Sequence, residues 1–218
     1  AQPESAGAVL KAMLDYKEWL SSPVVPPPAL AGIERKAGRE VLKAAGGKAS
    51  LGEVETRPLL AAYGIPLVEG GFAANSAEAA AVAARIGYPV VMKIVSPQLL
   101  HKSDAGGIKL NLADEAALRQ AYSAMMTEIN AARPDALLEG VMVERMAPKG
   151  QEVIIGMRRD PGFGPLMMFG LGGIYVELFK DVSFRVAPLS AADARQMITE
   201  TRAGRLLTGF RGQPRADL

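Results

Sequence analysis

Hydrophobic and polar residues follow two different periods along this chain. Apolar positions repeat at helical spacing in the stretches 7–20, 33–45, 51–63, 75–86, 114–131 and 191–202. Short apolar or alternating runs predict strands at 67–74, 90–95, 108–112, 140–146, 152–158, 166–169, 174–178 and 183–187. This order predicts an α+β fold, with helices and strands mixed in the first half and antiparallel strands dominating the second.

Residues with strong local preferences mark the expected ends of these elements. Ser50 and Glu53 form the pattern of a capping box at the start of the third helix. Four prolines between Ser21 and Pro28 predict an extended linker. We therefore expect a connector followed by two lobes, each with a sheet and helices, and a small-molecule cleft between the lobes.

The predicted strand at 90–95 carries one charge in an apolar run. Alternation puts Met92 and Ile94 on one face and Lys93 on the other, between two valines. An ammonium group with apolar neighbours loses hydration, so it favours an anionic partner. The alternative is an edge-strand lysine whose stem packs and whose head reaches solvent.

The loop after this strand combines glycines with a histidine. Gly106 and Gly107 lack side chains, so their backbone N–H groups can approach a phosphate closely. His101 is the only histidine in the chain. Together with Lys93, these residues favour phosphate chemistry, although their spacing matches neither a Walker A loop nor a dinucleotide fingerprint. The alternatives are a hairpin turn at the glycines and a solvated histidine.

Composition narrows the class of protein. The chain has 218 residues, of which 49% are hydrophobic and 22% charged, as is ordinary for a globular protein. A net charge of +2 without a dense Lys/Arg run argues against nucleic acid as a partner. The absence of cysteine excludes thiolate metal sites, and a single histidine disfavours a zinc site. No apolar run has the length of a membrane span and no signal peptide is visible, so we expect a cytoplasmic location without membrane contact.

Several longer motifs follow one another in a fixed order from Leu51 onward. They are Tyr63-Gly64-Ile65-Pro66, 87–93 with Lys93 at its end, Ser96-Pro97, His101-Lys102-Ser103-Asp104-Ala105-Gly106-Gly107, 141–144, 152–156, Phe163-Gly164-Pro165, Phe169-Gly170-Leu171-Gly172-Gly173 and 181–185. In this order they resemble the ATP-grasp domain of the ADP-forming acyl-CoA synthetases, the acetate–CoA ligase group. The resemblance implies an ATP-grasp fold of two α+β lobes with a nucleotide cleft between them. Residues 51–139 would form the N-terminal lobe, 140–218 the C-terminal lobe, and 1–50 a helical, proline-rich connector from an upstream domain.

The resemblance also implies roles for individual residues. Phosphate contacts fall to Lys93, Gly106 and Gly107, adenine recognition to Glu144, Arg145, Met146 and Ala147, and ribose recognition to Glu152. The alternatives are a surface carboxylate on a strand for Glu144 and a charge beside a turn for Glu152. By the same resemblance, His101 is a candidate catalytic relay that passes phosphate between a phosphohistidine on another domain or subunit and ADP. Imidazole suits this task because it attacks as a free base and leaves as a phosphoramidate, but His101 can also simply anchor the loop or donate to a phosphate.

The implied reaction converts acid, CoA and ATP to acyl-CoA, ADP and phosphate through phosphohistidine. The expected cofactors are ATP or ADP and Mg²⁺, with the magnesium ligands beyond residue 218. The expected partners are CoA-binding and ligase domains in the same protein or in a partner subunit. We therefore expect a part of a larger ligase, inactive when isolated and binding nucleotide weakly.

Three other functions remain open from the sequence. The main alternative is the regulatory ATP-grasp domain of a protein lysine acetyltransferase, in which the HKSD motif and the strand lysine also occur. A second is another ATP-grasp ligase, which makes an acyl phosphate for an amine and is not expected to share the HKSD motif. The third is an α+β scaffold that binds no nucleotide.

Overall fold

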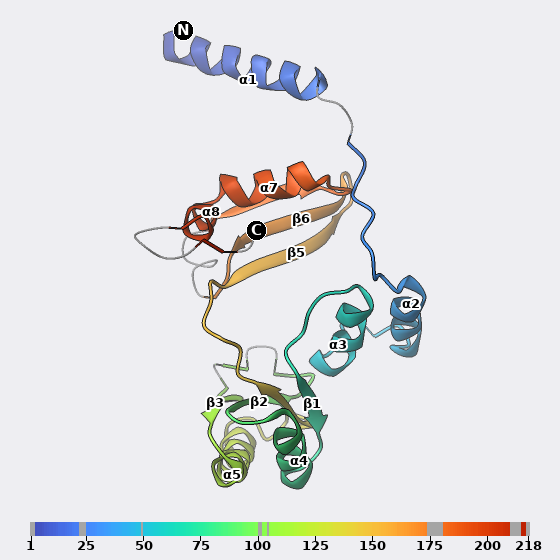
Figure 1. Cartoon of the computed structure of the whole chain (residues 1–218), viewed down its shortest axis with the longest axis vertical. Helices are drawn as coiled ribbons and strands as arrows, with labels where there is room; N and C mark the ends of the chain where they lie inside the picture. Colours follow the sequence, from blue (N-terminus) through green and yellow to red (C-terminus); the bar gives the residue numbers. More distant parts are fainter. Residues whose placement is uncertain are drawn as a thin grey trace. The chain divides into compact units, whose positions relative to one another are not determined.

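A computed structural model describes residues 3–21, 25–48, 50–99, 102–103, 105–173, 181–209 and 215–216. The chain divides into two compact units (Figure 1). We call Leu30–Lys149 the four-stranded unit, and Ala1–Ala29 together with Gly150–Leu218 the three-stranded unit.

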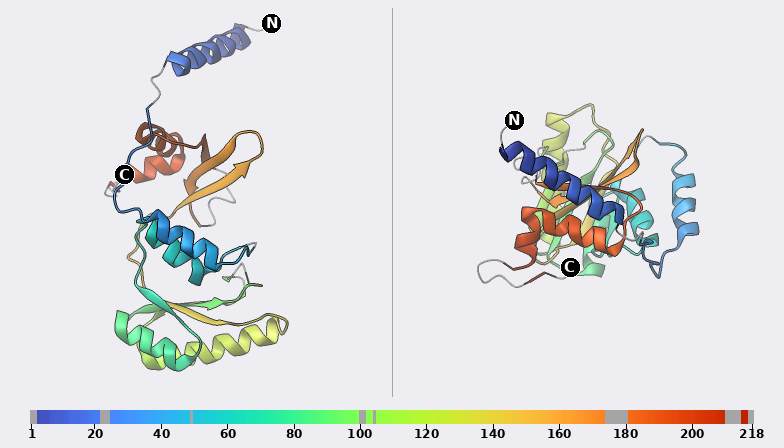
Figure 2. Two further views of the ribbon diagram at one scale, coloured as in Figure 1. Left: turned by 90° about the vertical axis from the view of Figure 1, so that its right-hand side faces the viewer. Right: turned by 90° about the horizontal axis from the view of Figure 1, so that it is seen from above.

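The four-stranded unit is an antiparallel sheet with helices on both sides. Its strands are β1 (Gly70–Ala73), β2 (Val90–Val95), β3 (Ile108–Leu112) and β4 (Gly140–Arg145), in the order β1-β4-β2-β3. Two helices cover one face, α4 (Ser76–Ile86) and α5 (Glu115–Ala132). Two others lie on the opposite side of the sheet, α2 (Arg35–Ala44) and α3 (Glu53–Ala62) (Figure 2).

The core of this unit follows from the predicted periods. Met92 and Ile94 of β2 are fully buried against Leu118 and Met125 of α5. The side chain of Asn75 caps α4 by accepting a hydrogen bond from the Glu78 N–H at 3.0 Å. Because successive strand residues alternate between faces, Lys93 lies on the face opposite Met92 and Ile94, as predicted, and this face carries α3.

Strand β4 determines where the four-stranded unit ends. It pairs with both β1 and β2, so that Glu144 lies opposite Gly70 on one side and Val91 on the other. The lobe boundary expected at residue 140 falls before this strand, whereas the structure divides the chain after Lys149. Residues 30–50, expected in the connector, also belong to this unit because α2 packs against α3.

The three-stranded unit is an antiparallel sheet with a helix on one face. Its strands are β5 (Val153–Asp160), β6 (Gly164–Leu171) and β7 (Val182–Val186), in the order β5-β6-β7. α7 (Ala191–Glu200) begins after its N-cap Ser190, whose side chain accepts from the Asp193 N–H, and the short α8 (Arg202–Leu207) follows it. The helix predicted over 191–202 therefore ends at Glu200. Phe169, Leu171, Met197 and Leu207 form the core. The strand expected at 174–178 lies outside the described residues.

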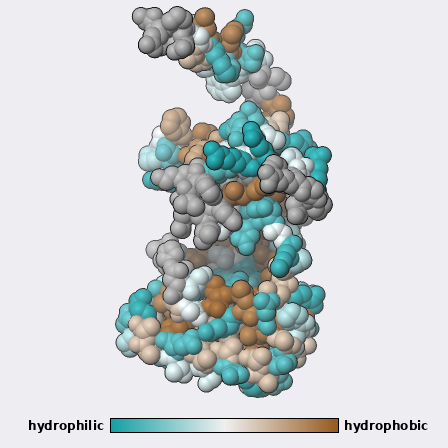
Figure 3. Space-filling model, turned by 90° about the vertical axis from the view of Figure 1, so that its left-hand side faces the viewer, coloured by the Kyte–Doolittle hydropathy of each residue, from teal (hydrophilic) through white to brown (hydrophobic). Residues whose placement is uncertain are grey.

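The predicted first helix is confirmed as α1 (Pro3–Ser21). Its apolar side chains stay open to solvent: Leu10, Met13 and Trp19 are 61%, 64% and 68% exposed. Brown, hydrophobic atoms are visible on the surface of this helix in Figure 3. Among the described residues, no helix combines the length and the apolar character needed to cross a membrane.

Candidate functional site

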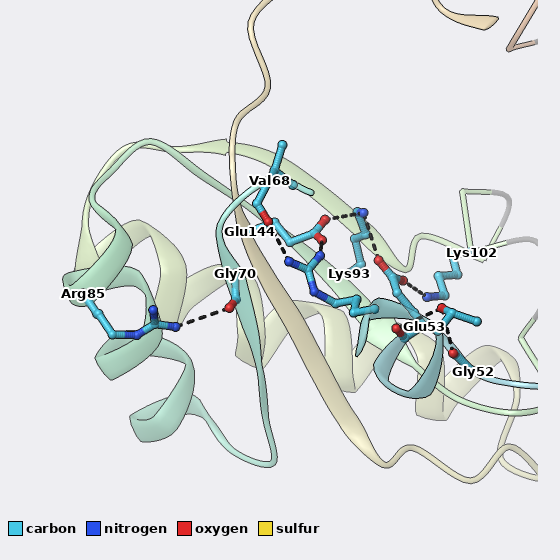
Figure 4. A network of polar contacts seen from close by, with 10 residues as sticks. Gly52, Glu53, Val68, Gly70, Arg85, Lys93, Lys102 and Glu144 are labelled. Carbon is cyan, nitrogen blue, oxygen red and sulfur yellow. Dashed lines mark hydrogen bonds and ion pairs between the residues drawn. The ribbon is translucent and has the colours of Figure 1, made fainter. Parts of the chain in front are cut away.

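A chain of alternating charges lies on the α3 side of the four-stranded sheet (Figure 4). Glu144 of β4 accepts hydrogen bonds from Arg57 of α3 and, at 2.5 Å, from the Lys93 ammonium group. Glu53 of α3 accepts from Lys93 at 3.0 Å with Oε1 and from Lys102 at 2.5 Å with Oε2. We call these five residues the charge network. It joins α3, β2, β4 and the loop between β2 and β3.

The start of α3 explains why Glu53 reaches this network. The N-cap is Gly52, whose N–H donates to Glu55 Oε2 at 2.7 Å. The predicted capping box of Ser50 with Glu53 is therefore wrong, and Glu55 takes the capping role. Glu53 is the first residue of the helix, and Arg57 lies one turn later on the same helical face. Both side chains are thereby directed at the sheet.

Burial and pairing act in opposite directions on the charges of this network. The side chains of Glu144, Glu53 and Lys93 are 5%, 24% and 28% exposed. Burial by itself lowers the pKa of Lys93, but its hydrogen bonds to Glu144 and Glu53 outweigh this and raise the pKa above the ordinary 10.5. Burial likewise raises the pKa of Glu53, but Lys102 and Lys93 together hold it below the ordinary 4.5. Both groups are therefore charged at neutral pH.

Gly106 and Gly107 close the loop between β2 and β3. The Gly106 N–H donates to the Ser103 carbonyl at 3.2 Å, and the Gly107 N–H to the Lys102 carbonyl at 2.7 Å. Both N–H groups are thus already used inside the loop and are not free for a phosphate in this structure. The Gly107 carbonyl in turn accepts from the Ile94 N–H at 2.8 Å, which ties the loop to β2.

The residues predicted to read adenine lie at and after the end of β4. The Arg145 N–H donates to the Glu69 carbonyl at 2.8 Å, and its guanidinium donates to the Ile86 carbonyl. The Met146 N–H lies 3.3 Å from the Pro89 carbonyl. Met146 is half-buried and Ala147 exposed. Arg145 and Met146 therefore already have backbone partners within the unit.

Glu152 and His101 are the two remaining predicted site residues. Glu152 belongs to the three-stranded unit, where its carbonyl accepts from the Gly172 N–H at 2.9 Å. His101 lies outside the described residues, although its neighbour Lys102 is described.

Sequence reasoning missed three members of the network: Glu53, Arg57 and Lys102. The sequence predicts Glu53 in a helix cap, because a carboxylate three residues after a serine fits a capping box. The available signal was the spacing of Glu53 and Arg57, because residues four apart share a helical face. Lys102 lies within the HKSD motif, but the motif by itself indicates no role for it.

A pocket of about 510 Å³ adjoins the network within the same unit. Its wall includes the first turn of α3 and the segment after β2, and it contains both Glu53 and Lys102. The rest of the lining mixes apolar side chains, among them Leu51, Phe72 and Leu99, with charged ones, namely Lys48, Glu55 and Glu139. One side of the Glu53–Lys102 ion pair therefore faces open space.

Known families and relatives match most of this chain. A family model described as "ATP-grasp domain" matches residues 42–218. The beta subunit of acetate–CoA ligase [ADP-forming] I from Pyrococcus furiosus is 51% identical over 178 residues, which cover 82% of this chain and 77% of that subunit. The 4-hydroxybutyrate–CoA ligase [ADP-forming] from Nitrosopumilus maritimus is 40% identical over 218 residues. That match covers 99% of this chain but 31% of the relative, so the chain spans about a third of that protein.

A solved structure gives the same result at the level of the fold. The dinucleotide-forming acetyl-coenzyme A synthetase 1 of Ca. Korarchaeum cryptofilum, in complex with coenzyme A, Ca-AMPCP and HgCl⁺, aligns with a TM-score of 0.78 at 50% identity. The alignment covers 83% of this chain and 80% of that one. The α+β prediction and the resemblance are confirmed. This chain belongs to the ATP-grasp domain family and is homologous to the beta subunits of ADP-forming acetate–CoA ligases.

Proposed function

We propose that this chain is the nucleotide-binding, phosphoryl-transfer module of an ADP-forming acyl-CoA synthetase. The larger protein would convert an acid, CoA and ATP to acyl-CoA, ADP and phosphate. The observation that carries the proposal is the half-buried Lys93 ammonium group, held beside Lys102 in a chain homologous to such ligases. These relatives do not support the alternative regulatory role next to an acetyltransferase domain.

The two lysines would supply positive charge to the phosphates of the nucleotide. Lysine has three N–H donors, and Lys93 uses two of them on Glu53 and Glu144. A cation in a partly desolvated position acts more strongly on a phosphate than one in bulk water. It would stabilise the charge that moves between oxygens during phosphoryl transfer. Because the N–H groups of Gly106 and Gly107 are used within the loop, we assign the phosphate contacts to the lysines first.

The remaining candidate residues keep proposed roles around these phosphates. His101 precedes Lys102 in the chain, so the loop that carries the second cation also carries the proposed phosphohistidine relay. Met146 and Ala147 would contact the base, with Glu144 holding the end of that segment to Lys93. Glu152 would accept hydrogen bonds from the ribose.

Magnesium and the partner domains belong to the larger assembly in this proposal. A solved relative, 46% identical with a TM-score of 0.67, is the Korarchaeum synthetase in complex with coenzyme A and Mg-AMPPCP. Among the described residues of this chain, no group of three or more His, Cys, Asp or Glu side chains could hold a metal ion. We therefore assign no magnesium ligand and derive no step from the metal. The expected partners are CoA-binding and ligase domains.

Replacing Lys93 with methionine tests the proposed nucleotide site. The variant keeps one cation on each carboxylate, because Arg57 still pairs with Glu144 and Lys102 with Glu53. Loss of one charge-assisted phosphate contact should weaken ADP binding about tenfold or more, measured by titration calorimetry. Lys109→Met is the matched control, since Lys109 pairs with Glu128 on β3 and α5. Equal ADP affinity of the wild-type and Lys93→Met chains would contradict the proposal.

A further inference from the structure

The two carboxylates of the charge network differ in their burial and in their ion-pair partners. Glu144 is 5% exposed and is shared between Lys93 and Arg57. Glu53 is 24% exposed, and both of its partners, Lys93 and Lys102, are the cations assigned above to the nucleotide phosphates. The Glu53 carboxylate therefore lies between the two lysines, where a phosphate in contact with both of them would also have to lie.

We propose that Glu53 is a built-in counter-ion of the phosphate site, which a nucleotide must displace and which thereby sets the affinity for nucleotide. The proposal rests on the proposed function, because it takes Lys93 and Lys102 as phosphate contacts. It adds a residue that regulates the strength of that contact from α3.

The geometry of the ion pairs gives the first reason. Each carboxylate oxygen of Glu53 accepts from a different lysine, at 3.0 Å and 2.5 Å, as two oxygens of one phosphate group would. Without an anion between them, the two ammonium groups would repel each other in a partly desolvated position. A phosphate placed on both lysines while Glu53 remained would meet a carboxylate of like charge. The two lysines can therefore bind either Glu53 or a phosphate closely, but not both at once.

The surroundings of Glu53 give the second reason, because they allow its side chain to move away from the lysines while α3 stays folded. The first turn of α3 is closed without its side chain, by the Gly52 N–H bond to Glu55 and by the Thr56 N–H bond to the Gly52 carbonyl. Arg57 anchors the helix to Glu144 and, at 2.6 Å, to the Val68 carbonyl. The pocket of about 510 Å³ beside Glu53 gives the released carboxylate room in solvent. Displacement would break two ion pairs without unfolding the helix.

Glu53→Gln tests this in the 218-residue chain, with ADP titrated by calorimetry in magnesium-free buffer. Removal of the internal competitor should lower the Kd for ADP about three- to tenfold, the size expected for partly exposed ion pairs that no longer have to be broken. The affinity for tripolyphosphate, which has no base, should rise by a similar factor. The affinity for adenosine, which has no phosphate, should stay unchanged. Glu55→Gln is the control, because it removes an ion pair with Lys48 and a cap from the same helix without touching Lys93 or Lys102.

The outcomes separate the two proposals. If wild-type chain binds ADP more tightly than Lys93→Met but Glu53→Gln binds no more tightly than wild type, the counter-ion proposal is overturned and the nucleotide site stands. If wild type and Lys93→Met bind alike, the proposed function itself fails. Glu53→Asp is the second variant if the glutamine chain does not fold. Its side chain is one methylene shorter and cannot span both lysines, so an ADP affinity equal to or below that of wild type would again refute the idea.

Discussion

Lys93 and Glu53 show how a partly buried charge shifts the pKa of a partner of opposite charge. Each loses hydration in the folded chain, and each has more than one partner of opposite charge. Pairing outweighs burial in both, so the pKa of Lys93 rises and that of Glu53 falls. Lys93 and Glu53 therefore both stay charged over the neutral range, as the proposed phosphate contact requires of Lys93.

The same shifts predict how stability depends on pH. Because the pKa of Glu53 is lower in the folded than in the unfolded chain, its contribution is complete above the ordinary value of 4.5 and is lost as pH falls through the folded pKa. For Lys93 the sign is reversed: its contribution is complete below 10.5 and is lost as pH rises through the folded pKa. Glu53→Gln should therefore lower the free energy of unfolding by about 1–2 kcal/mol near neutral pH, and the difference should shrink in acid.

Urea unfolding of both chains at several pH values between about 3 and 7 measures this difference. Glu40→Gln is the control, because Glu40 and Lys43 form an exposed pair whose loss should cost less than about 0.5 kcal/mol. A difference between wild type and Glu53→Gln that stays constant down to the lowest pH would show that the Glu53 charge does not stabilise the fold.

At the scale of elements, packing gives the turn from β2 to β3 its own requirement for glycine. The sequence predicts glycines that let a phosphate approach the backbone, and this role stays a prediction. The structure shows a packed corner, where a Cβ on Gly107 would collide with the Ile94 side chain and lie 3.0 Å from the Lys102 carbonyl oxygen. A side chain there has no space in this structure.

Gly107→Ala should therefore destabilise the chain by about 1–3 kcal/mol, the usual cost of overpacking. Thermal unfolding measures the effect. Gly150→Ala is the matched control, since a Cβ there meets nothing within 4 Å, and it should shift stability by less than about 0.5 kcal/mol. Equal stability of the two variants would contradict the packing argument.

At the scale of the whole molecule, the two units differ in how they bury their strands. Among the described residues, β2 and β4 are almost entirely buried in the larger core, and each pairs with a strand on both sides. β5 is an edge strand, and its residues Ile155 and Met157 are 70% and 68% exposed. The backbone of β5 should open more easily than that of β2 or β4.

Amide hydrogen exchange of the intact chain tests this difference. The amides of β2 and β4 that are bonded within the sheet should exchange at least about tenfold more slowly than those of β5, because opening them exposes more apolar surface. The amides of β6, which pair on both sides within the smaller sheet, serve as the internal comparison. Slower exchange in β5 than in β2 would mean that burial in this core does not control local stability.

Much of the architecture could be read from local patterns. The periods located α4, α5 and the strand with Lys93, and the ordered motifs identified the family, because each of these signals lies within a short stretch of chain. The start of α3 was misplaced because Ser50 with Glu53 and Gly52 with Glu55 offer the same capping spacing. The spacing along the chain does not distinguish the two pairs. The tertiary structure does, because Glu53 pairs with Lys93 and Lys102 and Glu55 forms the cap.

The sequence by itself determined the elements, the family and the face of β2 from which Lys93 projects, since all of these depend on neighbours along the chain. Only the tertiary structure decided that β4 belongs to the first sheet and which carboxylates neutralise Lys93. Glu53 and Glu144 are 40 and 51 residues away from Lys93 in the sequence. Contacts over such distances arise from the packing of α3 and the pairing of β4, which no local period encodes.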